Sequence, residues 1–124
     1  MTVIRHSETR RTETPGAVMT TFASPTQGGA SLPLWRVDVA PGQTGPLHFI
    51  DAEQVWTILS GSAEITVDGV DHLIAAGDTI ILPPAILRQI SSAAEGFAAI
   101  VTAPAGARAG TPDKEGTIVP PWIA

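Results

Sequence analysis

Short runs of β-branched and apolar residues, separated by glycine, proline and aspartate, make up most of this sequence. No window has the i, i+3, i+4, i+7 apolar spacing of an amphipathic helix without a glycine or proline inside it. Asp68-Gly69 follows Ile65-Thr66-Val67 and predicts a β-hairpin, because glycine accepts the positive φ of a primed turn. The pattern predicts an all-β sandwich or barrel. The expected strands are 17–23, 32–40, 46–50, 54–60, 63–67, 70–74, 79–82, 87–91 and 97–102.

The size and charge of the chain exclude several classes of function. A chain of 124 residues predicts one domain. The net charge of −5 argues against a nucleic-acid partner and against binding to an anionic membrane surface. The absence of cysteine excludes disulfides, zinc ribbons and cysteine nucleophiles. The three histidines, His6, His48 and His72, leave little material for a histidine-rich metal site, and His72 is expected to face solvent.

The ends of the chain differ from its middle in composition. Residues 1–16 predict an N-terminal arm, residues 17–103 the barrel, and residues 104–124 a loop followed by a docking tail. The residues 117–124, called here the C-terminal segment, are apolar, and we expect them to pack on their own barrel or on a second subunit. The first residues lack the apolar stretch of a signal peptide, so the expected location is cytoplasmic.

Two segments have the residue spacing of a known family. Residues 42–61 (GQTGPLHFIDAEQVWTILSG) resemble the first cupin motif, G-x5-H-x-H-x3-E-x6-G. Residues 77–92 (GDTIILPPAILRQISS) resemble the second, G-x5-P-x-G-x2-H-x3-N. The chain is also similar to small single-domain cupins of actinobacterial type, in the run Glu53–Trp56, in Arg88 and in the Pro120–Trp122 tail. The resemblance implies a double-stranded β-helix (a jelly-roll barrel) with a ligand pocket at its mouth, and a homodimer.

The four metal-ligand positions that the resemblance implies are largely replaced. They fall on His48, Ile50, Gln54 and Arg88. An isoleucine has no donor atom, a glutamine offers a neutral amide oxygen, and an arginine is a permanent cation without a lone pair to donate. Strand parity turns Gln54 rather than Glu53 to the pocket. We therefore expect no cofactor, and no metal beyond weak or adventitious binding on His48 and Gln54.

The replaced positions suggest chemistry that needs no metal. His48 is predicted to be a general acid/base and Arg88 a clamp for an anionic oxygen, with Gln54 orienting the ligand. The expected ligand is a small molecule that carries a carboxylate or an enolate, and the reaction class is that of an isomerase, lyase, dehydratase or cyclase, as in secondary metabolism. The expected ligand-binding walls are Ile50, Trp56, Ile58 and Phe49, although parity favours the opposite face for Phe49.

Other interpretations of the same residues remain open. The protein could bind or sense a small ligand without chemistry, or it could be a conventional metal-dependent cupin. Arg88 could reach solvent or pair with a carboxylate, and the candidates are Asp51, Glu53 and Asp78. Gln54 could be only a hydrogen-bonded strand residue, and Trp56 a core residue. Trp35 and Trp122 are expected to serve in packing or at an interface.

Overall fold

The computed structural model describes all 124 residues and is almost entirely β-structure, as the sequence predicts. A three-residue 3-10 turn, η1 (His6–Glu8), is the one helical element. The strands are β1 (Arg10–Thr14), β2 (Ala17–Ala23), β3 (Leu34–Val39), β4 (Phe49–Ile50), β5 (Gln54–Val67), β6 (Val70–Ala75), β7 (Thr79–Leu82), β8 (Arg88–Thr102) and β9 (Ala109–Gly110). No helix has the length and apolarity needed to cross a membrane.

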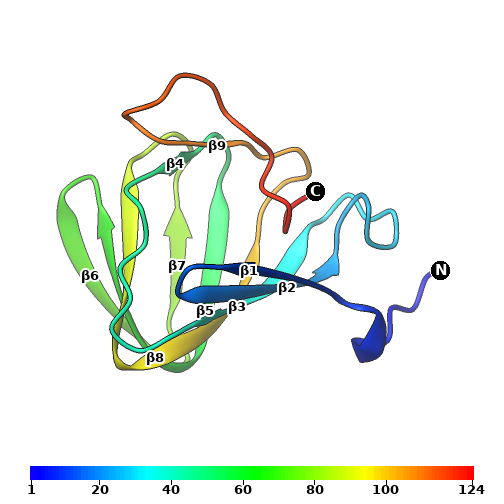
Figure 1. Cartoon of the computed structure of the whole chain (residues 1–124), viewed down its shortest axis with the longest axis horizontal. Coiled ribbons are helices and arrows are strands. Elements are labelled where there is room, and N and C mark those ends of the chain that lie inside the picture. The colour runs from blue at the N-terminus through cyan, green and yellow to red at the C-terminus, as the bar shows by residue number, and fades with distance from the viewer.

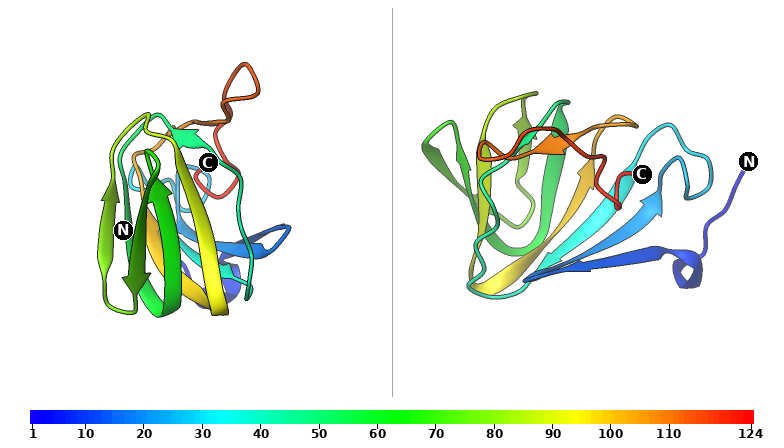
Figure 2. Two further views of the ribbon diagram at one scale, coloured as in Figure 1. Left: turned by 90° about the vertical axis from the view of Figure 1, so that its left-hand side faces the viewer. Right: turned by 45° about the horizontal axis from the view of Figure 1, so that its top comes forward.

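Seven of the nine strands form one bent antiparallel sheet. Its order is β1-β2-β3-β8-β5-β6, with β7 paired to the first half of β5. β4 and β9 form a second, two-stranded sheet. The N-terminal strands turn away from β5, β6 and β7, and the C-terminal segment runs between these two halves of the molecule (Figures 1 and 2). The strands β1, β6 and β7 each pair with one neighbour and are the edges of the large sheet. The homodimer stays a prediction.

Two predicted pairs of strands are single long strands. The runs 54–60 and 63–67 join in β5, and the runs 87–91 and 97–102 join in β8. The register between β5 and β8 shifts around Gly61, which has a φ of +71°. A glycine with positive φ occurs in β-bulges as well as in turns. Gly61, which the sequence pattern places in a turn between two strands, forms a bulge inside one strand.

The predicted hairpin at Asp68-Gly69 is confirmed. Both residues have positive φ, +49° and +79°, and they connect β5 directly to β6. Val67 and Val70 face each other across the turn. A type I′ turn needs positive φ at both central positions, so the local sequence determines this connection.

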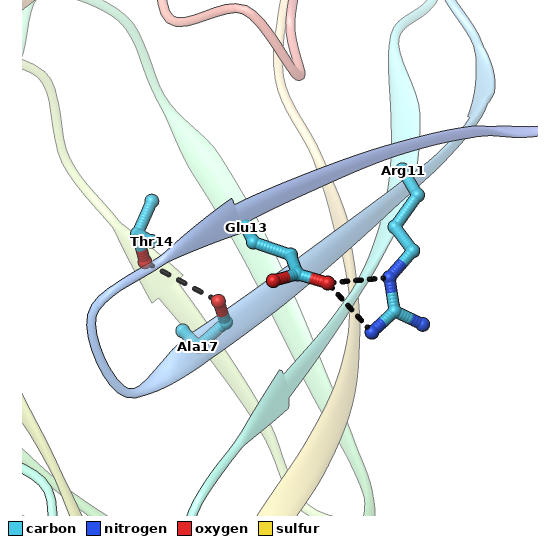
Figure 3. A network of polar contacts seen from close by, with 4 residues as sticks. All are labelled: Arg11, Glu13, Thr14 and Ala17. Carbon is cyan, nitrogen blue, oxygen red and sulfur yellow. Dashed lines mark hydrogen bonds and ion pairs between the residues drawn. The ribbon is translucent and has the colours of Figure 1, made fainter.

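The expected N-terminal arm includes a strand that the sequence pattern did not indicate. Strand β1 is polar, and it pairs with β2 along its whole length. Arg11 donates to Glu13 from Nε and Nη2 at 3.2 and 3.0 Å, and Thr14 Oγ1 donates to the carbonyl of Ala17 at 3.4 Å (Figure 3). An edge strand with no fully buried side chain shows no apolar alternation, which is why its sequence resembles a loop.

The C-terminal segment packs on its own barrel. Ile123 is completely buried in the main hydrophobic core. Thr21 Oγ1 donates to the carbonyl of Trp122 at 2.9 Å, and Ser24 Oγ donates to the backbone oxygen of Ala124 at 2.8 Å. Of the two expected arrangements, packing on its own barrel or on a second subunit, the C-terminal segment therefore adopts the first.

Candidate functional site

An apolar cavity of about 570 Å³ lies between the bent sheet and the C-terminal segment. Its size falls in the range of small-molecule pockets, roughly 300–1,000 Å³. It is lined by β2, β3, the start of β5, residues 43–50 and the stretch from β9 to the C-terminal segment. No Asp, Glu, Lys or Arg side chain lines it. All three tryptophans of the chain do, namely Trp35, Trp56 and Trp122.

His48 is the one titratable side chain in the lining of this cavity. Its backbone forms a two-way bridge with Arg88, with N···O distances of 2.9 and 2.8 Å. Its ring Nδ1 lies 2.9 Å from the carbonyl oxygen of Pro46. A carbonyl only accepts, so Nδ1 carries the proton and Nε2 keeps a lone pair in the neutral ring. The chain offers Nε2 no hydrogen-bond partner, which leaves it for a ligand.

The surroundings of His48 favour this neutral form. Burial lowers the pKa of His48 below its ordinary value of 6.5, and the nearby positive charge of Arg88 lowers it further. The hydrogen bond to Pro46 acts in the opposite direction and is the smaller effect than burial. At neutral pH the imidazole therefore has a lone pair to accept a proton.

Gln54 and Trp56, two residues apart on one face of β5, form the second polar feature of the cavity. Trp56 Nε1 donates to Gln54 Oε1 at 3.3 Å. An indole N–H is only a donor, so the contact also fixes which end of the amide is oxygen. Gln54 Nε2 has no partner in the chain and remains a donor for a ligand. Glu53 is exposed, so the parity prediction that turned Gln54 inward is confirmed.

Arg88 points into the barrel but does not line the cavity. It is fully buried, with Nε and Nη2 donating to the carbonyl of Ile86 and Nη2 also donating to that of Pro83, at 2.8–3.1 Å. Its Nη1 is buried without a partner, and burial lowers the pKa of the guanidinium. It reaches neither solvent nor any carboxylate, since the two ion pairs of the structure lie elsewhere. None of its N–H groups borders the cavity, so direct contact between Arg88 and a ligand stays a prediction.

The remaining predicted wall residues divide between cavity and core. Ile50 and Trp56 belong to the hydrophobic core and also border the cavity. Ile58 is a core residue and does not line it, and Phe49 packs on Gly110, where no Cβ would fit beside its ring. Trp35 and Trp122, expected in packing or at an interface, both line the cavity. Other apolar residues that the sequence did not indicate also line it: Met19, Val37, Ile90, Ile118 and Pro120.

The side chains at the four positions that correspond to the cupin metal ligands do not fit a divalent metal. One imidazole and one neutral amide are too few strong donors, and a buried guanidinium beside them repels a cation. Nowhere in the structure do three His, Asp or Glu side chains gather in a group that could hold a metal ion.

A second hollow, of about 740 Å³, lies on the surface beside the β1–β2 hairpin. Its charged groups already have partners in the chain. Glu13 pairs with Arg11, Arg36 pairs with Asp38 at 3.0 Å, and Glu95 accepts from Ser62. With no free charged group, it is a weaker candidate than the tryptophan-lined cavity.

A single-domain antiparallel barrel with one apolar, ligand-sized cavity defines the class of protein. The cupin domain model matches residues 35–103, and the chain belongs to the cupin family. Among curated proteins, no sequence matches this chain significantly. The family fixes the architecture and leaves the chemistry to the individual site.

Solved structures with the same fold share little sequence with the chain. Oxalate decarboxylase from Bacillus subtilis superposes with a TM-score of 0.70 at 19% identity, covering 79% of this chain and 27% of that one. A salicylate 1,2-dioxygenase from Pseudoaminobacter salicylatoxidans, solved with gentisate, has a TM-score of 0.73 at 16% identity, covering 85% and 31%. KdgF from Halomonas sp. has a TM-score of 0.70 at 17% identity, covering 84% and 94%. The chain thus spans about a third or less of the two larger enzymes and nearly all of KdgF.

Proposed function

We propose that this cupin is a metal-independent enzyme that moves a proton on a carbon atom next to a carbonyl, with His48 as the general base. The observation that carries the proposal is the state of the His48 ring. Pro46 holds Nδ1–H, burial and Arg88 favour the neutral form, and Nε2 is left to the cavity. A neutral imidazole near neutral pH has the basicity that proton abstraction requires.

The neighbouring residues have complementary roles in this mechanism. Nε2 of His48 takes the proton from carbon, and the electron pair of the broken C–H bond moves onto the carbonyl oxygen. Gln54 Nε2–H donates a hydrogen bond to that oxygen, and Trp56 keeps the amide in this orientation. The buried charge of Arg88 lies behind the site and stabilises the developing negative charge through space, without contact. The imidazolium then returns the proton to carbon or to a leaving hydroxyl.

A single titratable group in the lining restricts the reaction further. His48 must act as base and then as acid, so the proton leaves and returns on the same face of the substrate. Isomerisation, dehydration, cyclisation and lyase reactions of this kind are compatible with the site. Reactions that need a separate acid on the opposite face are not.

The test is deuterium exchange at the α-carbon of an aromatic ketone, 2-tetralone, in D₂O, followed by NMR. The wild-type chain is expected to exchange the α-protons faster than free imidazole at equal concentration. His48→Gln should reduce the rate to that of buffer, whereas His72→Gln, which changes an exposed histidine on β6, should leave it unchanged. Wild-type exchange no faster than imidazole, or full exchange by His48→Gln, would refute the mechanism.

Non-catalytic binding of a small molecule is the second candidate. The observation that favours it is the small number of polar groups in a mostly apolar lining. Under this alternative, the protein binds its ligand and releases it unaltered, and the exchange experiment gives the same rate for the wild type and His48→Gln.

A further inference from the structure

The lining of the cavity constrains the charge of its ligand. No Asp, Glu, Lys or Arg side chain borders it, and its one titratable group, the His48 ring, is held in its neutral form. Its other polar side chains, those of Gln43, Gln54 and three threonines, are uncharged. His48 Nε2 accepts a hydrogen bond and Gln54 Nε2 donates one. An ionised ligand would lose hydration in such a cavity without a charged partner in contact, which is costly.

Arg88 is the group that could reverse this conclusion, because it is a cation without a counter-ion. Its guanidinium is 0% exposed, and the carbonyls of Pro83 and Ile86 occupy Nε and Nη2. Nη1, although unpartnered, is buried away from the cavity surface. The charge therefore acts on His48 from a distance and offers no hydrogen bond to a ligand carboxylate.

The aromatic content of the cavity indicates the shape of the ligand. All three tryptophans border the cavity, but Trp35 on β3 is only 1% exposed and Trp56 on β5 only 7%. Trp122 on the C-terminal segment is half-buried, so it offers a ligand the most accessible indole surface. Indole rings bind flat apolar molecules through dispersion and through offset or edge-to-face stacking. Trp122 is half-buried and is held through its carbonyl by Thr21, so the C-terminal segment contributes one wall of the site.

We propose that the cavity takes an uncharged, flat aromatic ligand whose carbonyl acceptor faces Gln54 and whose proton donor faces His48, a C–H next to the carbonyl in the substrate and a hydroxyl in a bound analogue that is not turned over. Trp122 is then a specificity-determining residue. This inference rests on the proposed function for the location of the site, and it differs from the carboxylate or enolate expected from the sequence. It requires only binding and not turnover.

The experiment compares two probes with the same hydroxynaphthalene ring system, the neutral ester methyl 6-hydroxy-2-naphthoate and the ionised carboxylate 6-hydroxy-2-naphthoate. Binding to the full chain is measured by isothermal titration calorimetry at pH 7.5. The ester is expected to bind at least ten-fold more tightly than the carboxylate. Gln54→Leu and Trp122→Ala should each weaken ester binding about five- to ten-fold, while Leu73→Ala, an exposed residue on β6, should leave it unchanged.

Equal or tighter binding of the carboxylate, absence of ester binding, or ester binding that neither Gln54→Leu nor Trp122→Ala weakens would overturn the inference. Circular dichroism and thermal melting of each variant establish that it is folded. The two proposals fail separately. If the ester binds but exchange on 2-tetralone does not depend on His48, the proposed catalysis is refuted and the proposed ligand class stands. If the carboxylate binds more tightly but exchange depends on His48, the ligand class is refuted and the catalysis stands.

Discussion

Gly61 and Gly77, one in each sequence motif, allow the effect of steric contact to be separated from that of backbone strain. Both have positive φ, +71° and +90°. A Cβ at Gly61 would overlap the carbonyl oxygen of Gly96 and touch Phe97 Cα, whereas a Cβ at Gly77 would meet nothing within 4 Å. Alanine at either position adopts an unfavourable conformation, but only at Gly61 must the β5–β8 bulge also move.

The expected cost follows from these two contributions. An alanine in the left-handed region costs about 1–2 kcal/mol, and this is the whole effect expected for Gly77→Ala. Forcing an extra carbon into a packed backbone contact costs about 1–3 kcal/mol more. Gly61→Ala is therefore expected to lower the free energy of unfolding by about 2–5 kcal/mol, a large part of the stability of a small domain.

Urea unfolding followed by tryptophan fluorescence measures both variants against the wild type, with linear extrapolation to zero denaturant. The prediction is that Gly61→Ala loses more stability than Gly77→Ala by about 1–3 kcal/mol. If the two variants lose equal stability, the bulge relaxes at no cost and the packing argument is wrong. If Gly61→Ala does not fold, the Gly77→Ala variant still measures the backbone contribution alone.

Three further outcomes are expected. Because folding lowers the pKa of His48, the unfolded state binds more protons than the folded state below about pH 6.5, and the free energy of unfolding should fall as pH drops from 7.5 to 5.5. His48→Gln should flatten this part of the plot of stability against pH. An unchanged slope in His48→Gln would contradict the prediction. Arg88→Met should raise the pKa of His48 in an NMR titration, since the nearby positive charge is removed, and an unchanged or lower pKa would refute that coupling. Ile123→Ala should cost about 2–5 kcal/mol in urea unfolding while Ile118→Ala, 64% exposed, costs far less; equal losses would mean that Ile123 does not anchor the C-terminal segment.

The fold was predictable where local sequence alone determines conformation. Asp68-Gly69 fixes its hairpin, and the strands at 17–23 and 79–82 have the predicted bounds. The prediction divided β5 and β8 because a glycine with positive φ signals a turn or a bulge equally well. Which of the two forms depends on the partner strand, and the approach of Gly96 to Gly61 is visible only in three dimensions.

The candidate site was predictable as far as strand parity and motif spacing reach. They bring His48, Ile50 and Gln54 to one cavity. Parity and spacing do not show which backbone carbonyls accept hydrogen bonds from an inward-pointing side chain, so they predict contact between Arg88 and the ligand. The role of Trp122 depends on where the C-terminal segment packs, which is a long-range contact without a local sequence signal.

Arg88 illustrates why a cation at a position where the cupin motif has a metal ligand does not by itself predict an anionic substrate. Parity determines that its side chain points inward, but the carbonyls of Pro83 and Ile86 determine that its hydrogen bonds are used within the protein. Its charge still reaches His48, since Coulomb interactions act over distances at which hydrogen bonds cannot form. The same residue can thus keep the base neutral, favour negative charge in a transition state and leave ground-state recognition to tryptophans and an amide. An enzyme built in this way would bind a neutral substrate and stabilise charge only as the reaction creates it.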